Sequence, residues 1–254
     1  MLPRNGRHWL RNLIYPGLDL HTRNRASLCS FWETGPRVVF DAGSGNGYFS
    51  WLAYKSGATV VAANFEKGQV DKAKEYLLEY KKADPNRLQF EQYNLYDLPK
   101  ETRTFDEIIC FEVLEHLRRD SDVVREFFRI LRPGGVLHVC CPNRLHPRHQ
   151  AEVLDLNETG GHVRSGYTED DYRELLEPLG FKIDRVVGIG PRSVYIADNF
   201  LRTIRNRFGD LFALPFFPLM LLLIWVARPN PLVPFSIYVK AIKPERRQEL
   251  PPYS

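Results

Sequence analysis

The spacing of apolar residues along the chain follows two patterns, one typical of strands and one typical of helices. Short apolar runs bounded by turn residues predict strands at 37–43, 59–65, 88–94, 105–111, 136–142, 181–190 and 235–243. Longer segments with helical spacing predict helices at 46–57, 66–83, 121–135 and 168–180. Alternation of strand and helix is typical of a mostly parallel sheet covered on both faces, so we predict the α/β class.

Length and charge limit the number of domains and the class of partner. A chain of 254 residues fits one α/β domain with additions better than two equal domains. We predict a core at 36–190, a helical cap at 1–35, an apolar helical insertion at 191–233, and a last strand with a tail at 234–254. The net charge of +4 is dispersed, which argues against a nucleic-acid partner.

The cysteines indicate the cellular compartment. Cys29, Cys110, Cys140 and Cys141 have no metal-ligand spacing, and three of them lie in or beside apolar runs. We therefore expect reduced core thiols and a cytoplasmic protein. The N-terminal stretch lacks an apolar segment long enough for a signal peptide, which argues against secretion.

The end of the first predicted strand is the main candidate for a ligand site. "VVFDAGSGNG" places Asp41, Gly43, Gly45 and Gly47 where a strand passes into a helix. In open α/β sheets ligands bind at this edge, and glycine lets a ligand touch the main chain. A tight turn without a ligand is the alternative. A dinucleotide fingerprint would require its third glycine where Tyr48 stands, which argues against NAD.

Three segments together identify a family. "FDAGSGNG", "FDEIICFEVLEHL" and "ILRPGGVLHVCCPN" resemble the motifs of class I S-adenosylmethionine-dependent methyltransferases, and the resemblance covers residues 36–190. "EVLEHL" is similar to the branch that contains quinone-biosynthesis O-methyltransferases and small-RNA 2′-O-methyltransferases. The resemblance implies a Rossmann-like, seven-stranded, mostly parallel sheet with an antiparallel last strand.

The same resemblance implies a cofactor site. The three glycines would approach the methionine part of S-adenosylmethionine, Asp41 would face its ammonium, and Arg25, or alternatively Arg23, would pair with its carboxylate. The acid that usually binds the ribose is replaced by Asn64, with Glu66 nearby. The acid at the adenine position is replaced by Asn94, with Asp97 as the less favoured substitute. The expected site also includes Phe65, Leu95 and Phe111.

Acceptor chemistry would come from residues after the fourth strand. If the acceptor is a hydroxyl, a neutral histidine suits removal of its proton, and the candidates are His116 and His162. Glu112, Glu115, His116 and His162 together form a ligand set that suits Mg²⁺, Mn²⁺ or Zn²⁺. In metal-free relatives the glutamate would instead cap the cofactor loop. His146 and His149 are a second source of ligands, expected to be exposed.

The apolar segment 211–227 raises a separate question. It is too short for a bilayer span, and Pro215 and Pro218 interrupt it, so we predict no transmembrane helix. It could be a cap over the active site, a homodimer face, or a peripheral contact with the inner membrane surface, next to the basic stretch 202–207. In each case we expect the acceptor to be at least partly apolar.

The sequence thus predicts an S-adenosylmethionine-dependent methyltransferase that acts on an oxygen of a small or lipid-like metabolite. Two alternatives stay open. One is an RNA 2′-O-methyltransferase, favoured by the Glu-x-x-Glu-His group. The other is a non-catalytic binding protein with a cofactor fold, favoured by the amides at Asn64 and Asn94.

Overall fold

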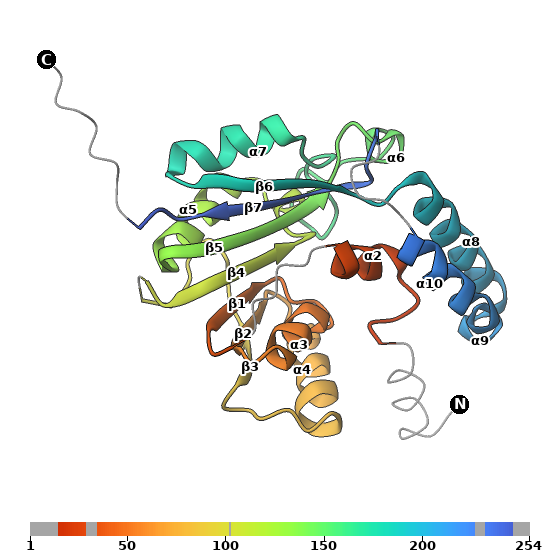
Figure 1. Cartoon of the computed structure of the whole chain (residues 1–254), viewed down its shortest axis with the longest axis horizontal. Coiled ribbons are helices and arrows are strands. Elements are labelled where there is room, and N and C mark those ends of the chain that lie inside the picture. The colour runs from red at the N-terminus through yellow and green to blue at the C-terminus, as the bar shows by residue number, and fades with distance from the viewer. Residues whose placement is uncertain (1–14, 29–34, 102, 227–231, 246–254) are drawn as a thin grey trace, which may run out of the picture.

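The computed structural model describes residues 15–28, 35–101, 103–226 and 232–245. A seven-stranded sheet in the order β3-β2-β1-β4-β5-β7-β6 forms its centre (Figure 1). This confirms the predicted fold class. The strands are β1 (Val38–Ala42), β2 (Thr59–Asn64), β3 (Leu88–Gln92), β4 (Phe105–Phe111), β5 (Leu131–Pro142), β6 (Lys182–Ile189) and β7 (Ser236–Ile242).

Strand direction agrees with the prediction. β1 pairs in parallel with β2 and β4, and the next strands on either side, β3 and β5, are also parallel. β7 runs antiparallel between β5 and β6, with Val239 opposite both Val139 and Val186. Because the chain leaves β1 for β2 on one side and later enters β4 on the other, the sheet has a topological switch point at the carboxyl end of β1.

Helices cover both faces of the sheet. One face packs against α3 (Tyr48–Lys55), α4 (Lys67–Lys74) and the π-helix η1 (Glu75–Tyr80) that continues α4. The other face packs against α5 (Asp120–Ile130), α7 (Glu169–Leu176) and η3 (Glu177–Leu179). α7 begins with a full capping box between Thr168 and Asp171, as the sequence pattern indicates.

One predicted boundary is wrong. We expected a helix over 121–135, but α5 ends at Ile130 and β5 begins at Leu131. Pro133 has no N–H to continue a helix, and Gly134 adopts φ 79°. The register of β5 against β4 shifts between Phe105 and Glu107, so 132–135 form an irregular start to the strand.

A helical lobe lies at the carboxyl edge of the sheet (Figure 1). It contains α2 (Leu20–Leu28), α8 (Arg192–Phe208), α9 (Asp210–Ala213), η4 (Leu214–Phe216) and α10 (Phe217–Val226). Leu20 of α2 shares an apolar core with Leu201 of α8 and Phe217 of α10. The N-terminal and late additions, expected as separate parts, therefore form one body. Short helices η2 (Leu114–His116) and α6 (Pro147–Gln150) lie in loops at the same edge.

Two further expectations concern cysteines and membrane spans. Cys110, Cys140 and Cys141 are buried free thiols, as predicted. Cys29 and the N-terminal stretch before residue 15 lie outside the described residues.

In the part of the chain that the structure describes, no helix combines the length and the apolar character that crossing a bilayer requires.

Candidate functional site

The loop between β1 and α3 carries three glycines in the left-handed region, with φ of 75° at Gly43, 53° at Gly45 and 79° at Gly47. A Cβ at Gly43 would lie 2.3 Å from Val113 Cγ2, and one at Gly47 would lie 2.6 Å from Leu77 Cδ1. Among the described residues, a Cβ at Gly45 would meet nothing closer than the carbonyl oxygen of Gly43 at 4.0 Å. The outer two glycines are thus required by packing, whereas Gly45 leaves bare backbone facing open space.

That space is a cavity of about 640 Å³ between the glycine loop, α2 and α8. Several of the predicted site residues line it, namely Arg25, Gly43, Gly45, Phe111 and Glu112. The opposite wall comes from Arg148, His149, Glu152 and His162 in the loop after β5, and from Asp198, Arg202 and Arg205 of α8. A single cavity therefore joins the glycine loop to His162.

Asp41 lies buried at the base of the loop. Its carboxylate accepts a hydrogen bond of 2.5 Å from the Ser50 hydroxyl. Burial raises the pKa of Asp41 to about 6, and the hydrogen bond from Ser50 opposes that rise. The charged form of Asp41 is therefore costly unless a cation approaches it.

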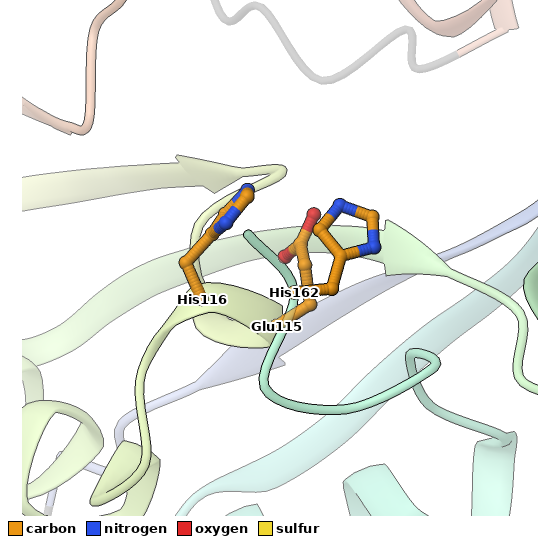
Figure 2. A group of neighbouring side chains, drawn as sticks. All are labelled: Glu115, His116 and His162. Atoms are coloured by element: carbon orange, nitrogen blue, oxygen red, sulfur yellow. The ribbon is translucent and has the colours of Figure 1, made fainter. Parts of the chain in front are cut away.

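Figure 2 shows a second group of side chains, formed by Glu115 and His116 in η2 after β4 and by His162 in the loop after β5. One possible ligand atom from each lies within 4.8 Å of the others. Glu115 is fully buried, and neither of its carboxylate oxygens has a hydrogen-bond partner among the described residues. The two imidazole rings meet edge to face at 4.7 Å. His162 lines the cavity, whereas Glu115 and His116 are not among its lining residues.

Hydrogen bonds fix the tautomers of both histidines. His116 Nδ1 lies 2.9 Å from the Gly161 carbonyl oxygen, and His162 Nδ1 lies 2.8 Å from Glu152 Oε2. Both oxygens only accept, so each Nδ1 carries the proton and donates it. Each Nε2 then keeps its lone pair, which leaves it able to accept a proton or bind a metal.

The loop that carries His162 is held by Asp155. Its carboxylate accepts hydrogen bonds from the backbone N–H groups of Thr159 and Gly161 and from the Thr159 hydroxyl. These bonds lower the pKa of Asp155 to about 2. The backbone N–H of Asp155 in turn donates to the His162 carbonyl at 2.7 Å. The position of His162 therefore depends on a closed local network.

Comparison with known proteins identifies the family. The family model described as a methyltransferase domain matches residues 40–139. A probable S-adenosylmethionine-dependent methyltransferase of Mycolicibacterium smegmatis is 30% identical over 160 residues, covering 60% of this chain and 55% of the relative. A ubiquinone biosynthesis O-methyltransferase of Paracidovorax citrulli is 27% identical over 143 residues, covering 56% of this chain and 58% of the relative. Residues 40–139 form a methyltransferase domain, and around it the chain is similar to S-adenosylmethionine-dependent methyltransferases.

A solved structure supports the fold of this methyltransferase chain. Phosphoethanolamine N-methyltransferase 2 of Haemonchus contortus, in complex with S-adenosyl-L-methionine, matches with a TM-score of 0.62 at 17% identity, over 88% of this chain and 52% of that one. At that identity the likeness shows the fold alone. The chain spans little more than half the length of the two curated relatives.

The predicted ribose and adenine positions of the methyltransferase lie along the exposed edge beyond the cavity. Asn64 Oδ1 accepts from the Glu66 N–H at 3.1 Å, and Asn64 Nδ2 donates to Gln69 at 3.1 Å. Asn94 is exposed and accepts from the Tyr96 N–H at 3.0 Å. Phe65 is 73% exposed, Leu95 is partly buried, and neither lines the cavity. An aromatic side chain left in water at this edge is consistent with a ligand-facing position.

The amide at Asn64 allows a test of the ribose assignment. We expect Asn64→Asp to tighten S-adenosylmethionine binding about fivefold, because a charged acceptor gains about 1 kcal/mol over a neutral one. Calorimetric titration measures the change. Gln89→Glu is the control, since it adds the same charge at an exposed position on β3. Affinity that stays the same or falls in the Asn64 variant would show that the site is built around the amide.

The buried Asp41 predicts opposite pH dependences for stability and for cofactor binding. Because its folded pKa is raised, its contribution to stability is fully present below its usual value of 3.8 and is lost as pH rises through about 6. An ammonium placed nearby favours the charged form of Asp41. Below pH 6 we therefore expect affinity for the cofactor to increase as pH increases, by up to about tenfold per pH unit. Titrations of the parent and of Asp41→Asn across this range check this. An equal slope in both proteins would contradict it.

Arg25 and Glu112 form an ion pair in the cavity wall, with Nη2 and Oε1 3.3 Å apart. Glu112 adopts φ 55°, and its N–H donates to the Cys140 carbonyl at 2.8 Å. Burial raises the pKa of Glu112, and Arg25 opposes that rise. A left-handed non-glycine residue at the end of β4 stores strain of the kind found at functional sites. Arg25 lines the cavity, and its pairing with the cofactor carboxylate stays a prediction.

The alternative candidate, Arg23, has a structural role. Its guanidinium donates to the carbonyls of Gly17 and Tyr15 and lies over the Phe217 ring at 4.8 Å. These contacts hold α2 within the helical lobe.

The structure does not bring Glu112 into the group of three possible metal ligands. Their spacing would place Glu112, Glu115 and His116 on one face if the segment turned helically, but η2 begins only at Leu114. The left-handed turn at Glu112 directs its carboxylate to Arg25, and it lies outside the group of three. His149 also differs from expectation, because it is 2% exposed rather than solvated and its Nδ1 lies 3.4 Å from Glu152 Oε1.

The opposite wall of the cavity was not predicted from the sequence. Arg148 and Glu152 lie in a segment whose apolar residues have no regular spacing. Asp198, Arg202 and Arg205 lie on α8, which the sequence analysis predicts only as part of an apolar insertion. The pair Asp198 and Arg202, four residues apart in sequence and 2.6 Å apart in space, was the available signal.

Proposed function

We propose that this chain transfers a methyl group from S-adenosylmethionine to an oxygen of a small or lipid-like acceptor. One observation carries the proposal: a single cavity runs from the open backbone at Gly45 to His162, whose Nδ1 is held by Glu152. The ubiquinone biosynthesis O-methyltransferase among the relatives supports oxygen as the acceptor atom. Leu18, Phe111 and Phe235 also line the cavity, which supports an acceptor that is partly apolar.

The glycine loop and its surroundings would position the methyl donor. When bound, S-adenosylmethionine supplies a methyl group on a good leaving group, so alignment accounts for much of the rate. Gly45 allows close approach, Asp41 offers a negative charge beneath the loop, and Arg25 offers a positive one beside it. The network of Asn64, Glu66 and Gln69 presents amide and carboxylate oxygens at the exposed edge.

His162 is the side chain best placed to take the proton of an acceptor hydroxyl. Its Nδ1–H donates to Glu152, which leaves Nε2 as the basic atom. The carboxylate of Glu152 holds the ring in this tautomer and stabilises the positive charge that forms on proton transfer. His116 packs against the ring and would keep it oriented.

The group of three also fits a divalent metal. Glu115 is buried, both of its oxygens lack a hydrogen-bond partner within the described ranges, and both histidines keep an Nε2 lone pair. Burial and the neighbouring Glu112 raise the pKa of Glu115 well above its usual value, a cost that a cation would remove. Glu115, His116 and His162 would hold Mg²⁺, Mn²⁺ or Zn²⁺, and the ion would polarise the acceptor oxygen.

Untargeted profiling with a labelled methyl donor tests the proposal. The purified chain, S-adenosylmethionine carrying a labelled methyl group, and a polar and a lipid extract are incubated together, and new labelled products are identified by mass. We expect a product that carries the label on oxygen. Label on nitrogen or carbon would contradict the choice of atom. Absence of any labelled product, with the cofactor shown to bind, would favour the non-catalytic alternative.

A further inference from the structure

The helical lobe presents large apolar side chains to solvent on its outer side. Eight of them lie on α8, at the α8–α9 junction, and along α9, η4 and α10. Their exposed fractions range from 42% to 64%: Ile196, Phe200, Phe208, Leu211, Phe212, Phe216, Leu219 and Leu222. We call these eight residues the lobe surface. A clustered apolar surface of this kind marks an interaction site.

Ring contacts and helical spacing bring several side chains of the lobe surface together. Phe200 of α8 meets Phe216 of η4 edge to face at 5.4 Å, and Phe208 meets Phe212 at 6.0 Å. Ile196 and Phe200 are four residues apart and so share one face of α8. The inner face of α8 is different, because Leu201 packs in the core of the lobe.

The charges around the lobe surface are basic. Four arginines and two aspartates lie between residues 192 and 226. Both aspartates are already paired, Asp198 with Arg202 at 2.6 Å and Asp210 with Arg205 at 2.8 Å. The other two arginines, Arg192 and Arg207, have no ion pair with any described residue. Arg207 lies over the Phe208 ring at 5.5 Å, which places a cation at the rim of the apolar side chains.

We propose that the lobe surface docks on an anionic lipid bilayer, with its apolar side chains in the interface and Arg192 and Arg207 at the headgroups. Charge complementarity decides for lipid over a second copy of the chain. A two-fold self-contact would bring arginines of both copies, which lack ion pairs, to one apolar interface, whereas anionic headgroups neutralise them. Short helices broken by Pro215 and Pro218 suit a segment that lies in the interface plane.

Docking would bring the cavity close to the bilayer. α8 lines the cavity with Arg202 and Arg205 and carries Ile196 and Phe200 on its outer face. An amphiphilic acceptor could then reach the cavity without crossing bulk water. Docking itself does not rest on the proposed methyl transfer, because it depends only on exposed side chains and charge.

Vesicle co-sedimentation of the full chain tests the proposal. The two probes are vesicles of phosphatidylcholine alone and of an equimolar mixture with phosphatidylglycerol. We expect binding to the mixed vesicles that weakens as salt rises. Phe212→Glu combined with Leu219→Glu should reduce binding by about tenfold or more, because two exposed anchors are lost. Arg192→Glu with Arg207→Glu should remove the preference for anionic vesicles.

Leu156→Glu is the matched control, because Leu156 is 62% exposed but lies outside the lobe surface. Thermal unfolding of each variant shows whether it is folded. Lack of vesicle binding by the parent chain overturns the proposal, and so does equal binding by the folded lobe variants. A parent dimer that the lobe substitutions dissociate, without vesicle binding, would assign the lobe surface to a second copy instead. Labelled methyl transfer is measured separately, so failure of docking and failure of the proposed function are distinguishable.

Discussion

Gly45→Val is expected to weaken S-adenosylmethionine binding by about a hundredfold or more, equivalent to about 3 kcal/mol. A Cβ placed on the Gly45 backbone meets no atom of the described residues closer than 4.0 Å, so the added side chain would occupy the open space over the loop. The loop lines the cavity, and the cofactor would have to occupy that same space. Calorimetric titration with S-adenosylmethionine measures the loss.

The valine also carries a backbone cost, because Gly45 has φ 53°. Gly209→Val is the matched control, since Gly209 has φ 93°, its added Cβ would meet no described atom within 4 Å, and it lies outside the cavity. The Gly209 variant should lose at least as much stability in thermal unfolding, because Gly209 combines φ 93° with ψ 169°, whereas only the Gly45 variant should lose the cofactor. A folded Gly45 variant that binds as tightly as the parent would remove the glycine loop from the site.

His162→Ala is expected to lower the turnover number by about 10²–10⁴ while leaving cofactor affinity unchanged, the range for loss of a general base. Its imidazole lines the cavity, and the hydrogen bond to Glu152 fixes the basic nitrogen. Steady-state kinetics with the acceptor found by profiling gives the loss. Added imidazole should restore part of the activity to the alanine variant, which a purely structural role would not allow.

A chelator separates the two forms of this prediction. If His162 acts alone as a base, turnover is insensitive to chelator and His116→Ala loses less activity than His162→Ala, because His116 does not line the cavity. If the three residues hold a metal, chelator abolishes turnover and Glu115→Gln, His116→Ala and His162→Ala lose similar amounts. Full activity in His162→Ala would contradict both forms.

Periodicity and turn chemistry were sufficient to predict most of the fold. The apolar runs predicted the seven strands. The glycines after Asp41 predicted which edge of the sheet binds a ligand, because three spaced glycines are more than a strand-to-helix turn requires. The start of β5 was missed because a helix and a strand meet directly at Leu131, with no polar turn between them.

The acceptor side of the site could be predicted only in part. The pairing of His116 with His162 came from the family pattern, since the two residues are separated by a long loop and approach only through tertiary contacts. Glu152 was missed because it lies in a loop whose apolar residues have no regular spacing. The place of Glu112 depended on one left-handed residue, which helical spacing could not anticipate. The contribution of α8 depended on how two distant additions pack together.

The most direct test of the cofactor site is a crystal structure of the chain with S-adenosylhomocysteine. We predict the amino acid end of the ligand over the glycine loop between Asp41 and Arg25, its sulfur in the cavity that leads to His162, and its ribose hydroxyls at Asn64 or Glu66. A ligand bound elsewhere, or one whose amino acid end lies away from Gly45, would contradict the assignment of this edge as the cofactor site.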